Sequence, residues 1–357
     1  MWCLVIWSAK NTYRFLSGRK FVGYRSIHSH LAGTEKQAED LILPDMQVHR
    51  SLDHLPNFRN AVITIGTFDG VHHGHQAIIK SIVEDARSLQ GESIIITFHP
   101  HPRNIIRPEQ TLFCLSTIQE KLELLEKLGV DHVVVVPFSR EFSEMSASEY
   151  VEDFLLAKFH PKRIVIGYDH KFGRDRSGDI HLLRQLSEAA GVEVAEIGQQ
   201  QIEDITVSST RIRKYLQEGD VATAATLLGY QYTFSGVVVR GDGIGRTLGY
   251  PTANLLAGDD QKLIPGNGIY VCRVQLPGDV RLYGGMMSIG TRPTFDGQDT
   301  RIEVHIFDIS KDLYGDRLRV EMLERIRGEE KFASADELMA AMQQDEQASR
   351  ALLEKIA

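Results

Sequence analysis

The feature that most restricts the fold is an alternation, between residues 61 and 197, of apolar runs of strand length with amphipathic segments of helix length. A helix pattern is visible in the spacing of Ile78, Ile79, Ile82 and Val83. Strands that alternate with helices indicate a parallel, doubly wound α/β sheet, in which ligands bind at the carboxyl ends of the strands. The predicted strands are AVITIG, SIIITF, HVVVVPF, RIVIGY and VEVAEI.

After about Gln231 the pattern changes to short β-rich runs separated by Gly, Pro and Asp turns, without helices between them. This pattern predicts an antiparallel sheet or a small β-barrel. A last amphipathic stretch reads as a capping helix, with Ser334 as its N-cap and Glu337 three residues on. The β-rich runs are YTFSGVVVRG, GIYVCRVQL, YGGMMSIG, RIEVHIFDI and RLRVEMLERIR.

Residues 1–34 contain five basic residues and no acidic residue, a bias that organelle transit peptides share. The competing interpretation is an over-extended translation start or a disordered arm, because Met46 lies just before the first regular strand. Residues 1–45 are therefore left out of the predicted fold. The expected domains are 46–207 for the α/β domain, 208–230 for a helical connection ending at Gly229, and 231–357 for the β-barrel domain with its C-terminal helix.

The composition narrows the possible partners and compartments. A chain of 357 residues with 42% hydrophobic and 25% charged residues and a formal net charge of −8 has no basic excess for nucleic-acid binding. Cys3, Cys114 and Cys272 match neither a disulfide framework nor a zinc pattern, which favours a reducing compartment. No apolar run approaches the roughly 18 residues of a membrane span. We therefore expect a cytoplasmic protein without nucleic-acid or membrane partners, and the oligomeric state stays open.

The stretch GTFDGVHHGHQ, residues 66–76, follows the first predicted strand and opens a helix. The free N–H groups of a helix start attract anions, and Gly66, Gly70 and Gly74 let the backbone approach a ligand closely. His72 and His75 can point to one side and donate hydrogen bonds to phosphate oxygens. This arrangement suits nucleotidyl transfer, which requires positioning and charge stabilisation rather than a protein nucleophile.

Two other interpretations of these histidines remain. They could form a metal pair, with His99 or His101 of TFHPHPR as a further ligand, or they could be satisfied within the loop itself. The glycine spacing and the strand-helix context have no role in a metal site, and they favour phosphate binding.

The stretch FDGVHHGH resembles the H-x-G-H motif of the nucleotidyltransferase superfamily, in the version found in prokaryotic FAD synthetases. GYDHKFGRDRSGD (167–179) and VSSTRIR (207–213) resemble two further motifs of that family, although His170 stands where many members have Phe. The resemblance implies a nucleotide and metal contact for Asp169, and Ser208 could alternatively serve only as a helix cap. The implied ATP-binding residues are Gly66, Phe68, Gly74, Asp169, Ser208, Ser209, Thr210 and Arg213, with His72 and His75 as catalytic residues.

A second candidate site lies in the β-rich half. In GDGIGRTLGYPTANL, residues 241–255, the glycines alone are weak evidence, and a dinucleotide-binding turn is not expected because the segment runs into Pro251 rather than a helix. In RIEVHIFDI, Glu303 and His305 occupy alternate strand positions and face one side. The alternative for Glu303 is a structural ion pair with Arg301 or Arg319.

The 241–255 segment closely resembles the G-R-x-L-G-[FY]-P-T-A-N-L stretch of riboflavin kinases, and GGMMSIGTRPTFDG (284–297) and LERIRGEEKF (323–332) also resemble that family. The resemblance implies that Thr252 and Asn254 hold Mg²⁺ and ATP phosphates, and that Glu303 is the base for the ribityl 5′-hydroxyl. It also implies ATP binding by Gly245 and flavin binding by Arg246 and Arg292.

Together the motifs span about residues 60–345 and identify the chain as a member of the bacterial bifunctional riboflavin kinase and FMN adenylyltransferases. The implied function is conversion of riboflavin to FMN and then to FAD with ATP and Mg²⁺, the flavins being substrates and products rather than bound redox cofactors. Two rival functions are a single nucleotidyl transfer with the barrel as a flavin sensor, and a non-catalytic flavin carrier. Channelling of FMN between the sites and the preferred redox state of the flavin stay open.

Overall fold

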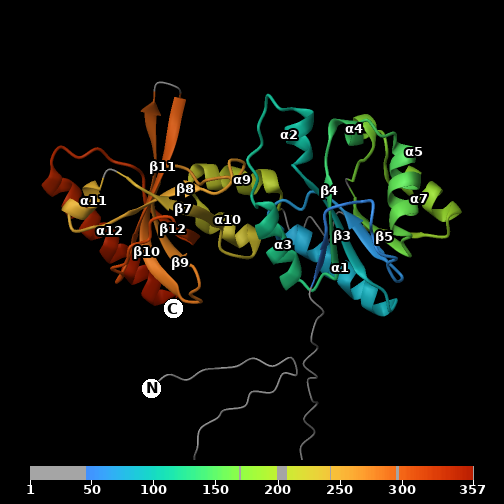
Figure 1. The fold of residues 1–357 in the computed structure, drawn as a ribbon, viewed down its shortest axis with the longest axis horizontal. Helices are drawn as coiled ribbons and strands as arrows, with labels where there is room; N and C mark the ends of the chain where they lie inside the picture. Colours follow the sequence, from blue (N-terminus) through green and yellow to red (C-terminus); the bar gives the residue numbers. More distant parts are fainter. Residues whose placement is uncertain (1–45, 169, 199–206, 242, 295–296, 357) are drawn as a thin grey trace, which may run out of the picture. The chain divides into compact units, whose positions relative to one another are not determined.

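The computed structural model describes residues 46–168, 170–198, 207–241, 243–294 and 297–356, and residues Leu43–Ala357 form one compact unit. Along the chain, this unit consists of a parallel sheet with helices followed by an antiparallel β-barrel with a C-terminal helix (Figure 1). The predicted fold class is therefore confirmed.

In the described part of the chain, the parallel sheet has six strands in the order β1-β4-β3-β2-β5-β6. The five strands predicted from apolar runs are confirmed as β2 to β6, while the edge strand β1 lies before the predicted start of the sheet at Ala61. The strands are β1 (Gln47–His49), β2 (Val62–Ile65), β3 (Ser93–His99), β4 (His132–Pro137), β5 (Arg163–Gly167) and β6 (Glu193–Ile197).

Successive residues of a strand point to opposite faces of the sheet, and the strands β2 to β5 are apolar at most positions. Both faces are therefore apolar, and helices cover each of them. Val62 packs with Ile79 in one apolar cluster, and its neighbour Ile63 packs with Phe154 in another. The first cluster is built on α1 (His73–Ser88) and α3 (Ile118–Lys127), and the second on η1 (Tyr150–Leu156) and α7 (Ile180–Ala189). Shorter helical segments are α2 (Pro102–Ile106), α4 (Arg140–Ser143), α5 (Ala147–Glu149), α6 (Ala157–Phe159) and η2 (Arg174–Arg176).

The strand order places the loop after β2 at the point where the sheet reverses its winding. β2 lies between β3 and β5: the connection that leaves β2 leads to β3 on one side, whereas the connection that leaves the neighbouring β5 leads to β6 on the other side. In open α/β sheets a crevice forms outside the strands at this position. The stretch 66–76 occupies it, as the sequence predicts.

The second half is a closed antiparallel barrel of six strands in the described residues, in the order β10-β11-β8-β7-β12-β9. Its interior holds large apolar side chains such as Tyr232, Phe234 and Tyr270, together with the free thiol of Cys272. The strands are β7 (Thr233–Val239), β8 (Ala253–Ala257), β9 (Gly268–Gln275), β10 (Leu282–Thr294), β11 (Gly297–Ile306) and β12 (Arg317–Arg327).

The predicted helical connection is two helices, α9 (Ser209–Glu218) and α10 (Val221–Leu228). Each ends at a glycine in the left-handed region, Gly219 (φ 84°) and Gly229 (φ 81°), as is common at helix C-termini. The stop predicted at Gly229 is confirmed. One helical turn, α11 (Ile244–Thr247), interrupts the β-rich half, where the sequence predicts no helix. Its four residues are too few to show the hydrophobic periodicity by which a helix is predicted.

The predicted capping helix is α12 (Ala335–Lys355), which lies against β9, β10 and β12. Ser334 is its N-cap and accepts the backbone N–H of Glu337 at 3.2 Å. The Glu337 carboxylate accepts the N–H of Ala333 (2.9 Å) rather than that of Ser334, so only half of the predicted reciprocal cap forms.

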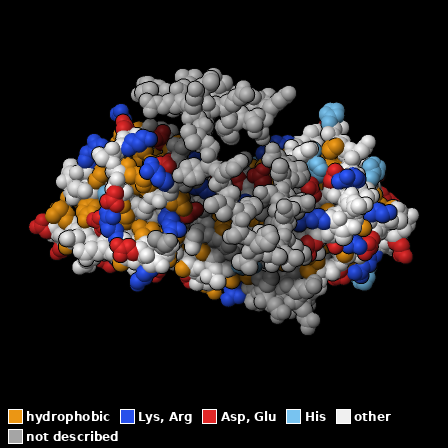
Figure 2. Space-filling model, turned by 90° about the horizontal axis from the view of Figure 1, so that it is seen from below, with side chains coloured by type: hydrophobic (Ala, Val, Ile, Leu, Met, Phe, Trp, Pro, Cys, Tyr) orange, Lys and Arg blue, Asp and Glu red, His pale blue; other side chains and the backbone are white. Residues whose placement is uncertain are grey.

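On the face shown in Figure 2, acidic and basic side chains are interspersed over the described surface. No helix within the described ranges is long and apolar enough to cross a membrane.

Gly173, in the segment after β5, packs closely against the backbone of Ala147. Its φ is +71° and its ψ is 175°, a region open essentially to glycine only, and a Cβ there would lie 2.7 Å from Cα of Ala147. We expect Gly173→Ala to lower the free energy of unfolding by roughly 2–4 kcal/mol, measured by urea titration.

Gly278→Ala is the matched control, because Gly278 has nearly the same φ (+70°) but nothing within 4 Å of an added Cβ. It should cost only about 1 kcal/mol. Equal losses in the two variants would contradict the packing argument.

Candidate active sites

The loop after β2 turns sharply before α1. Gly66 N–H donates to the carbonyl of Ile96 at 3.0 Å, and positive φ values follow at Phe68 (45°), Gly70 (80°) and Val71 (38°). Two of these residues have side chains, so the turn is held by its surroundings rather than by glycine freedom alone. The loop thus delivers the histidines to the start of a 16-residue helix.

His72 and His75 lie together at that helix start. Their rings stack with centroids 3.7 Å apart, and Phe68 packs edge-on against His75 at 5.3 Å. The backbone N–H of His75 donates to Nδ1 of His72 at 3.4 Å, which leaves the proton of a neutral His72 on Nε2. Nδ1 of His75 is buried and has no hydrogen-bond partner. A Cβ on Gly74 would lie 3.3 Å from the His72 ring, so glycine permits this close approach.

Burial keeps both rings neutral. It lowers the pKa of His72 to about 4, although the Asp69 carboxylate acts in the opposite direction. Burial also lowers the pKa of His75 well below its usual value, and the proximity of His72 and of the Lys121 ammonium lowers it further. At neutral pH the pair therefore offers N–H donors without fixed charge.

Asp69 is a buried carboxylate, 2% exposed, that fastens this loop. It accepts the backbone N–H groups of Leu115 (2.9 Å) and Ser116 (3.1 Å), and Arg213 of α9 donates to it as well. Ser116 Oγ in turn accepts the N–H of Gly70 at 3.0 Å. Sequence reasoning missed Asp69 as a structural residue, although its place inside the F-D-G-x-H-H-G-H stretch is a usable signal.

The predicted phosphate residues of the 207–213 segment lie at the start of α9. Ser208 is the N-cap, with Oγ accepting the N–H of Arg211 at 3.3 Å, as the capping interpretation requires. Ser209 Oγ donates to the carbonyl of Asp69 at 3.0 Å, which brings this helix start beside the histidine loop. Thr210 is exposed, and Arg213 also donates to the Phe113 carbonyl (2.9 Å), so its guanidinium already organises the loop.

A second buried cation, Lys121 of α3, was not predicted. Its ammonium donates to the carbonyl of Thr67 at 2.6 Å and to Oγ1 of Thr97 at 3.3 Å. It therefore sits directly beneath the loop that carries the histidines. A lysine in an amphipathic helix gives no sequence signal of this burial.

His99 is the last residue of the neighbouring strand β3 and His101 follows it by two residues, as the metal interpretation requires. His101 caps α2 by accepting the N–H of Arg103 at 3.2 Å, and burial lowers its pKa to about 4. The described residues contain no group of three His, Cys, Asp or Glu side chains that could hold a metal ion.

The segment after β5 is partly described. Asp169 lies outside the described residues, so its predicted role stays a prediction. The ring of His170 lies 5.8 Å from Phe172, and Phe172 stacks on Tyr150 at 5.2 Å. The ring at position 170 thus packs against an aromatic group, as expected for a replacement of Phe.

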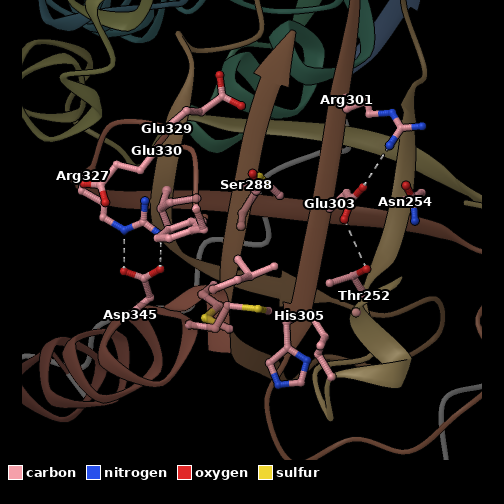
Figure 3. A pocket seen from close by; sticks show the side chains of 18 of the residues that line it. Thr252, Asn254, Ser288, Arg301, Glu303, His305, Arg327, Glu329, Glu330 and Asp345 are labelled. Atoms are coloured by element: carbon pink, nitrogen blue, oxygen red, sulfur yellow. Dashed lines mark hydrogen bonds and ion pairs between the residues drawn. The ribbon is translucent and has the colours of Figure 1, made fainter. Parts of the chain in front are cut away.

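The second site is a pocket of about 400 Å³ in the barrel (Figure 3). Glu303 and His305 of β11 both face it, as the alternation predicts, and Glu303 is in register with Asn254 of β8. Its apolar wall contains Leu248, Ile269, Met286, Met287, Phe332, Leu338 and Met342.

Polar groups converge beside Glu303. Its Oε2 accepts the hydroxyl of Thr252 at 3.4 Å, and Nη1 of Arg301 lies 3.9 Å from Oε1 (Figure 3). Arg319, the other structural partner considered, pairs with Glu123 instead. His305 Nδ1–H donates to the carbonyl of Pro251 at 2.8 Å. Glu303 therefore keeps a loose pairing and faces the pocket.

Glycines bring the backbone close to these groups. A Cβ on Gly241 would lie 2.2 Å from the amide nitrogen of Asn254, and one on Gly245 would lie 2.3 Å from the Tyr250 carbonyl. Thr252 also lines a second pocket of about 600 Å³, together with Arg246. Arg246 does not line the pocket of Glu303. Arg292 belongs to β10 in register with Asp299, and its side chain lies outside the described residues.

One ion pair that lines the pocket of Glu303 was not predicted from the sequence. Arg327 donates two hydrogen bonds to Asp345 of α12, at 3.0 and 2.7 Å, and both line the pocket of Glu303. The pair fastens the C-terminal helix to β12 at the pocket wall (Figure 3).

The chain matches known families over both halves. The family model for FAD synthetase matches residues 55–211 and that for riboflavin kinase matches residues 228–353. The chain is 36% identical over 289 residues to the bifunctional riboflavin kinase/FMN adenylyltransferase of Escherichia coli K12, covering 81% of this chain and 91% of the relative. It is 37% identical to the protein of the same name from Listeria monocytogenes, covering 83% and 94% of the two chains.

A crystal structure described as a macrolide-efflux protein from Streptococcus pneumoniae superposes with a TM-score of 0.78 at 32% identity. The match covers 86% of this chain and 99% of that chain. The order of parallel sheet and barrel is thus shared with a solved structure.

The neutral histidines predict a pH dependence of stability. The pKa of His72 is about 4 in the folded protein, against about 6.5 in an unfolded chain. Between pH 6.5 and pH 4, His72 is therefore protonated in the unfolded state but not in the folded state. The free energy of unfolding falls as the pH is lowered through this range. We expect a loss of roughly 2 kcal/mol from this group between pH 7 and pH 5, measured by urea unfolding.

His72→Gln isolates this contribution from the carboxylates, which titrate in both proteins. The variant should show a flatter pH dependence over this range. An unchanged slope would contradict the neutral, buried state of His72.

Proposed function

The chain belongs to the family of bifunctional riboflavin kinase/FMN adenylyltransferases, and we propose that each of its two reactions uses one of the two sites described above. The protein phosphorylates riboflavin to FMN and then adenylylates FMN to FAD, with ATP as co-substrate in both steps. We assign the kinase reaction to the barrel domain, 231–357, and the adenylyl transfer to the domain 46–207, with 208–230 as the helical connection. The observation that carries the kinase assignment is the convergence of Glu303, Thr252 and Asn254 on one apolar pocket.

In the kinase step, the ribityl 5′-hydroxyl of riboflavin attacks the γ-phosphorus of ATP. The new bond joins that oxygen to the γ-phosphorus, the bond to the β–γ bridging oxygen breaks, and ADP leaves. Glu303 takes the hydroxyl proton, because its carboxylate faces the pocket and is only loosely paired. The apolar wall of the same pocket suits the flavin ring system and excludes water from the reacting atoms.

The donors around Glu303 fit Mg²⁺. Thr252 provides a hydroxyl and Asn254 an amide oxygen, and hard oxygen ligands are those that Mg²⁺ prefers. We propose that these two residues hold Mg²⁺ with the ATP phosphates. The absence of side chains at Gly241 and Gly245 lets the backbone lie against Asn254 and Tyr250 beside this site. When bound, the ion neutralises negative charge on the phosphate oxygens.

Arg246 lines the second pocket at Thr252, whereas its predicted partner is the flavin. A guanidinium there suits a phosphate group, whether that of the nucleotide or that of the product FMN. Arg292 as a flavin contact stays a prediction.

In the adenylylation step, a phosphate oxygen of FMN attacks the α-phosphorus of ATP. The bond from that phosphorus to the α–β bridging oxygen breaks, and pyrophosphate leaves. Nε2–H of His72 and the ring of His75 stabilise the charge on the transferred phosphoryl oxygens, and the helix starts of α1 and α9 add backbone N–H groups.

We propose the residues implied by the family motifs as ATP contacts of this site: Gly66, Phe68, Gly74, Asp169, Ser208, Ser209, Thr210 and Arg213, with Asp169 also as a metal ligand. Ser209 supports this assignment because its hydroxyl ties the start of α9 to the histidine loop. We further propose that the protein acts in the cytoplasm, where ATP is available and the free thiols of Cys114 and Cys272 stay reduced.

The direct test is chromatography of the products that purified protein makes from riboflavin, ATP and Mg²⁺ over time. FMN should appear first and FAD later. If neither riboflavin nor added FMN is converted, a flavin-binding protein without catalysis is the better interpretation.

Glu303→Gln should lower riboflavin phosphorylation by roughly 100-fold or more, because the amide cannot take the hydroxyl proton. Conversion of added FMN to FAD should stay within about twofold, since that step uses the other site. Both rates are measured by separating the flavins. Glu324→Gln, on the exposed face of β12, is the matched control and should leave both rates intact. Loss of both activities in a folded Glu303→Gln protein would refute the assignment.

His75→Ala should have the opposite effect. We expect FAD formation from FMN to fall roughly 100-fold while riboflavin phosphorylation is preserved, because a donor to the transferred phosphoryl group is removed. His73→Ala, an exposed neighbour in the same stretch, is the control and should retain FAD formation. Unimpaired FAD formation in His75→Ala would rule out the phosphate role.

A further inference from the structure

A lysine of the barrel half reaches into the α/β half. Lys262 lies between β8 and β9, and only 4% of its side chain is exposed. Its ammonium donates to the carbonyl of Leu115 at 2.7 Å and to the carboxylate of Glu120 at 2.6 Å, and it lies 4.4 Å from the centre of the Tyr232 ring. All of these residues belong to the single compact unit Leu43–Ala357.

The backbone reinforces this contact. Cys114 N–H donates to the carbonyl of Gln261 at 2.6 Å, and Leu263 N–H donates to the carbonyl of Cys114 at 2.9 Å. The segment 113–117, which precedes α3, is therefore paired with the barrel loop on both sides of Lys262.

The same segment holds the histidine loop on its other side. In the peptide group between Leu115 and Ser116, the carbonyl accepts from Lys262 and the N–H donates to Asp69. Asp69 lies three residues before His72 in the loop. One buried peptide group thus separates a cation of the barrel from the carboxylate that fastens the adenylylation site.

These charges depend on one another because they are buried. Lys262 compensates Glu120, whose carboxylate also accepts the N–H of Thr117 at 2.9 Å in the cap of α3. Without the ammonium, the partly buried carboxylate of Glu120 loses its cation and keeps only the N–H of Thr117, and the buried carbonyl of Leu115 loses this donor, so the segment must move to find water. A shift of about 1 Å near reacting atoms can reduce a rate by roughly 100-fold.

We propose that Lys262 is a positioning residue for FMN adenylylation: through the 113–117 segment and Asp69 it holds the histidine loop, so that this reaction depends on a side chain of the kinase half. The inference rests on the proposed assignment of adenylylation to the histidine loop. Lys262 lines neither pocket at Thr252, so we expect the kinase reaction to proceed without it.

A second contact between the same halves provides a matched control. Arg319 of β12 pairs with Glu123 of α3 at 2.5 Å, and both side chains are one-third exposed. An exposed pair of this kind contributes little to stability. Arg319 lines a small pocket together with Leu115, Ser116 and Lys262. Arg319→Met therefore removes a nearby link between the halves while the hydrogen bonds from Lys262 to Leu115 and from Ser116 to Asp69 stay in place.

The experiment compares Lys262→Met, Glu120→Gln/Lys262→Met and Arg319→Met in the full-length protein. For each, kcat and KM are measured for FMN adenylylation and for riboflavin phosphorylation in the same preparation, with unfolding by urea. The double variant removes the unpaired carboxylate, so it restores stability without restoring the donor to Leu115.

We expect Lys262→Met to lower kcat/KM for adenylylation by roughly 10- to 100-fold, with riboflavin phosphorylation within about twofold of the wild type. The double variant should unfold at a higher urea concentration than Lys262→Met, yet its adenylylation rate should stay low. Arg319→Met should keep both activities. A gain of adenylylation that parallels the regained stability would overturn the inference, as would a parallel loss of both activities or an unchanged adenylylation rate in Lys262→Met. Wild-type protein that phosphorylates riboflavin but makes no FAD would instead overturn the proposed function, and the inference with it.

Discussion

The buried carboxylate of Asp69 is the interaction on which much of the adenylylation half depends. A charge at 2% exposure is tolerable only when donors surround it, and here these come from the 113–117 segment and from Arg213 of α9. Three pieces of chain that are far apart in sequence therefore meet at one side chain. The loop after β2 can keep positive φ at Phe68 and Val71 because this network holds it from outside.

Much of the fold could be predicted because its signals are local. The strands β2 to β6 are apolar runs of ordinary strand length, and the helices between them have a clear period. β1 has only three residues, with a single apolar one, which is too little for a pattern. Closure of the barrel depends on the pairing of β9 with β10 and β12, which no local sequence feature specifies.

The site residues divide in the same way. Glu303, Thr252 and Asn254 were found because strand alternation and short motifs place them, and the register of β8 with β11 then brings them together. Lys121 and Lys262 were missed because each is defined by partners that are distant along the chain. Because a lysine is usually exposed, the residues next to it in the sequence do not reveal that its side chain is buried. Buried charges are thus the part of such a site that requires a structure.

The strand pairing also bears on how the protein avoids association through its sheets. An unpaired strand edge is a template for another chain, and a closed barrel presents none. The parallel sheet has two edges, of which β1 offers only three residues and β6 carries Glu193 and Glu196. Glu193 is paired with Arg163 and Glu196 with Arg184, so the β6 edge of the sheet carries charged side chains of both signs. Short length protects one edge and charged side chains the other, so both halves can present extended β-structure with little tendency to aggregate.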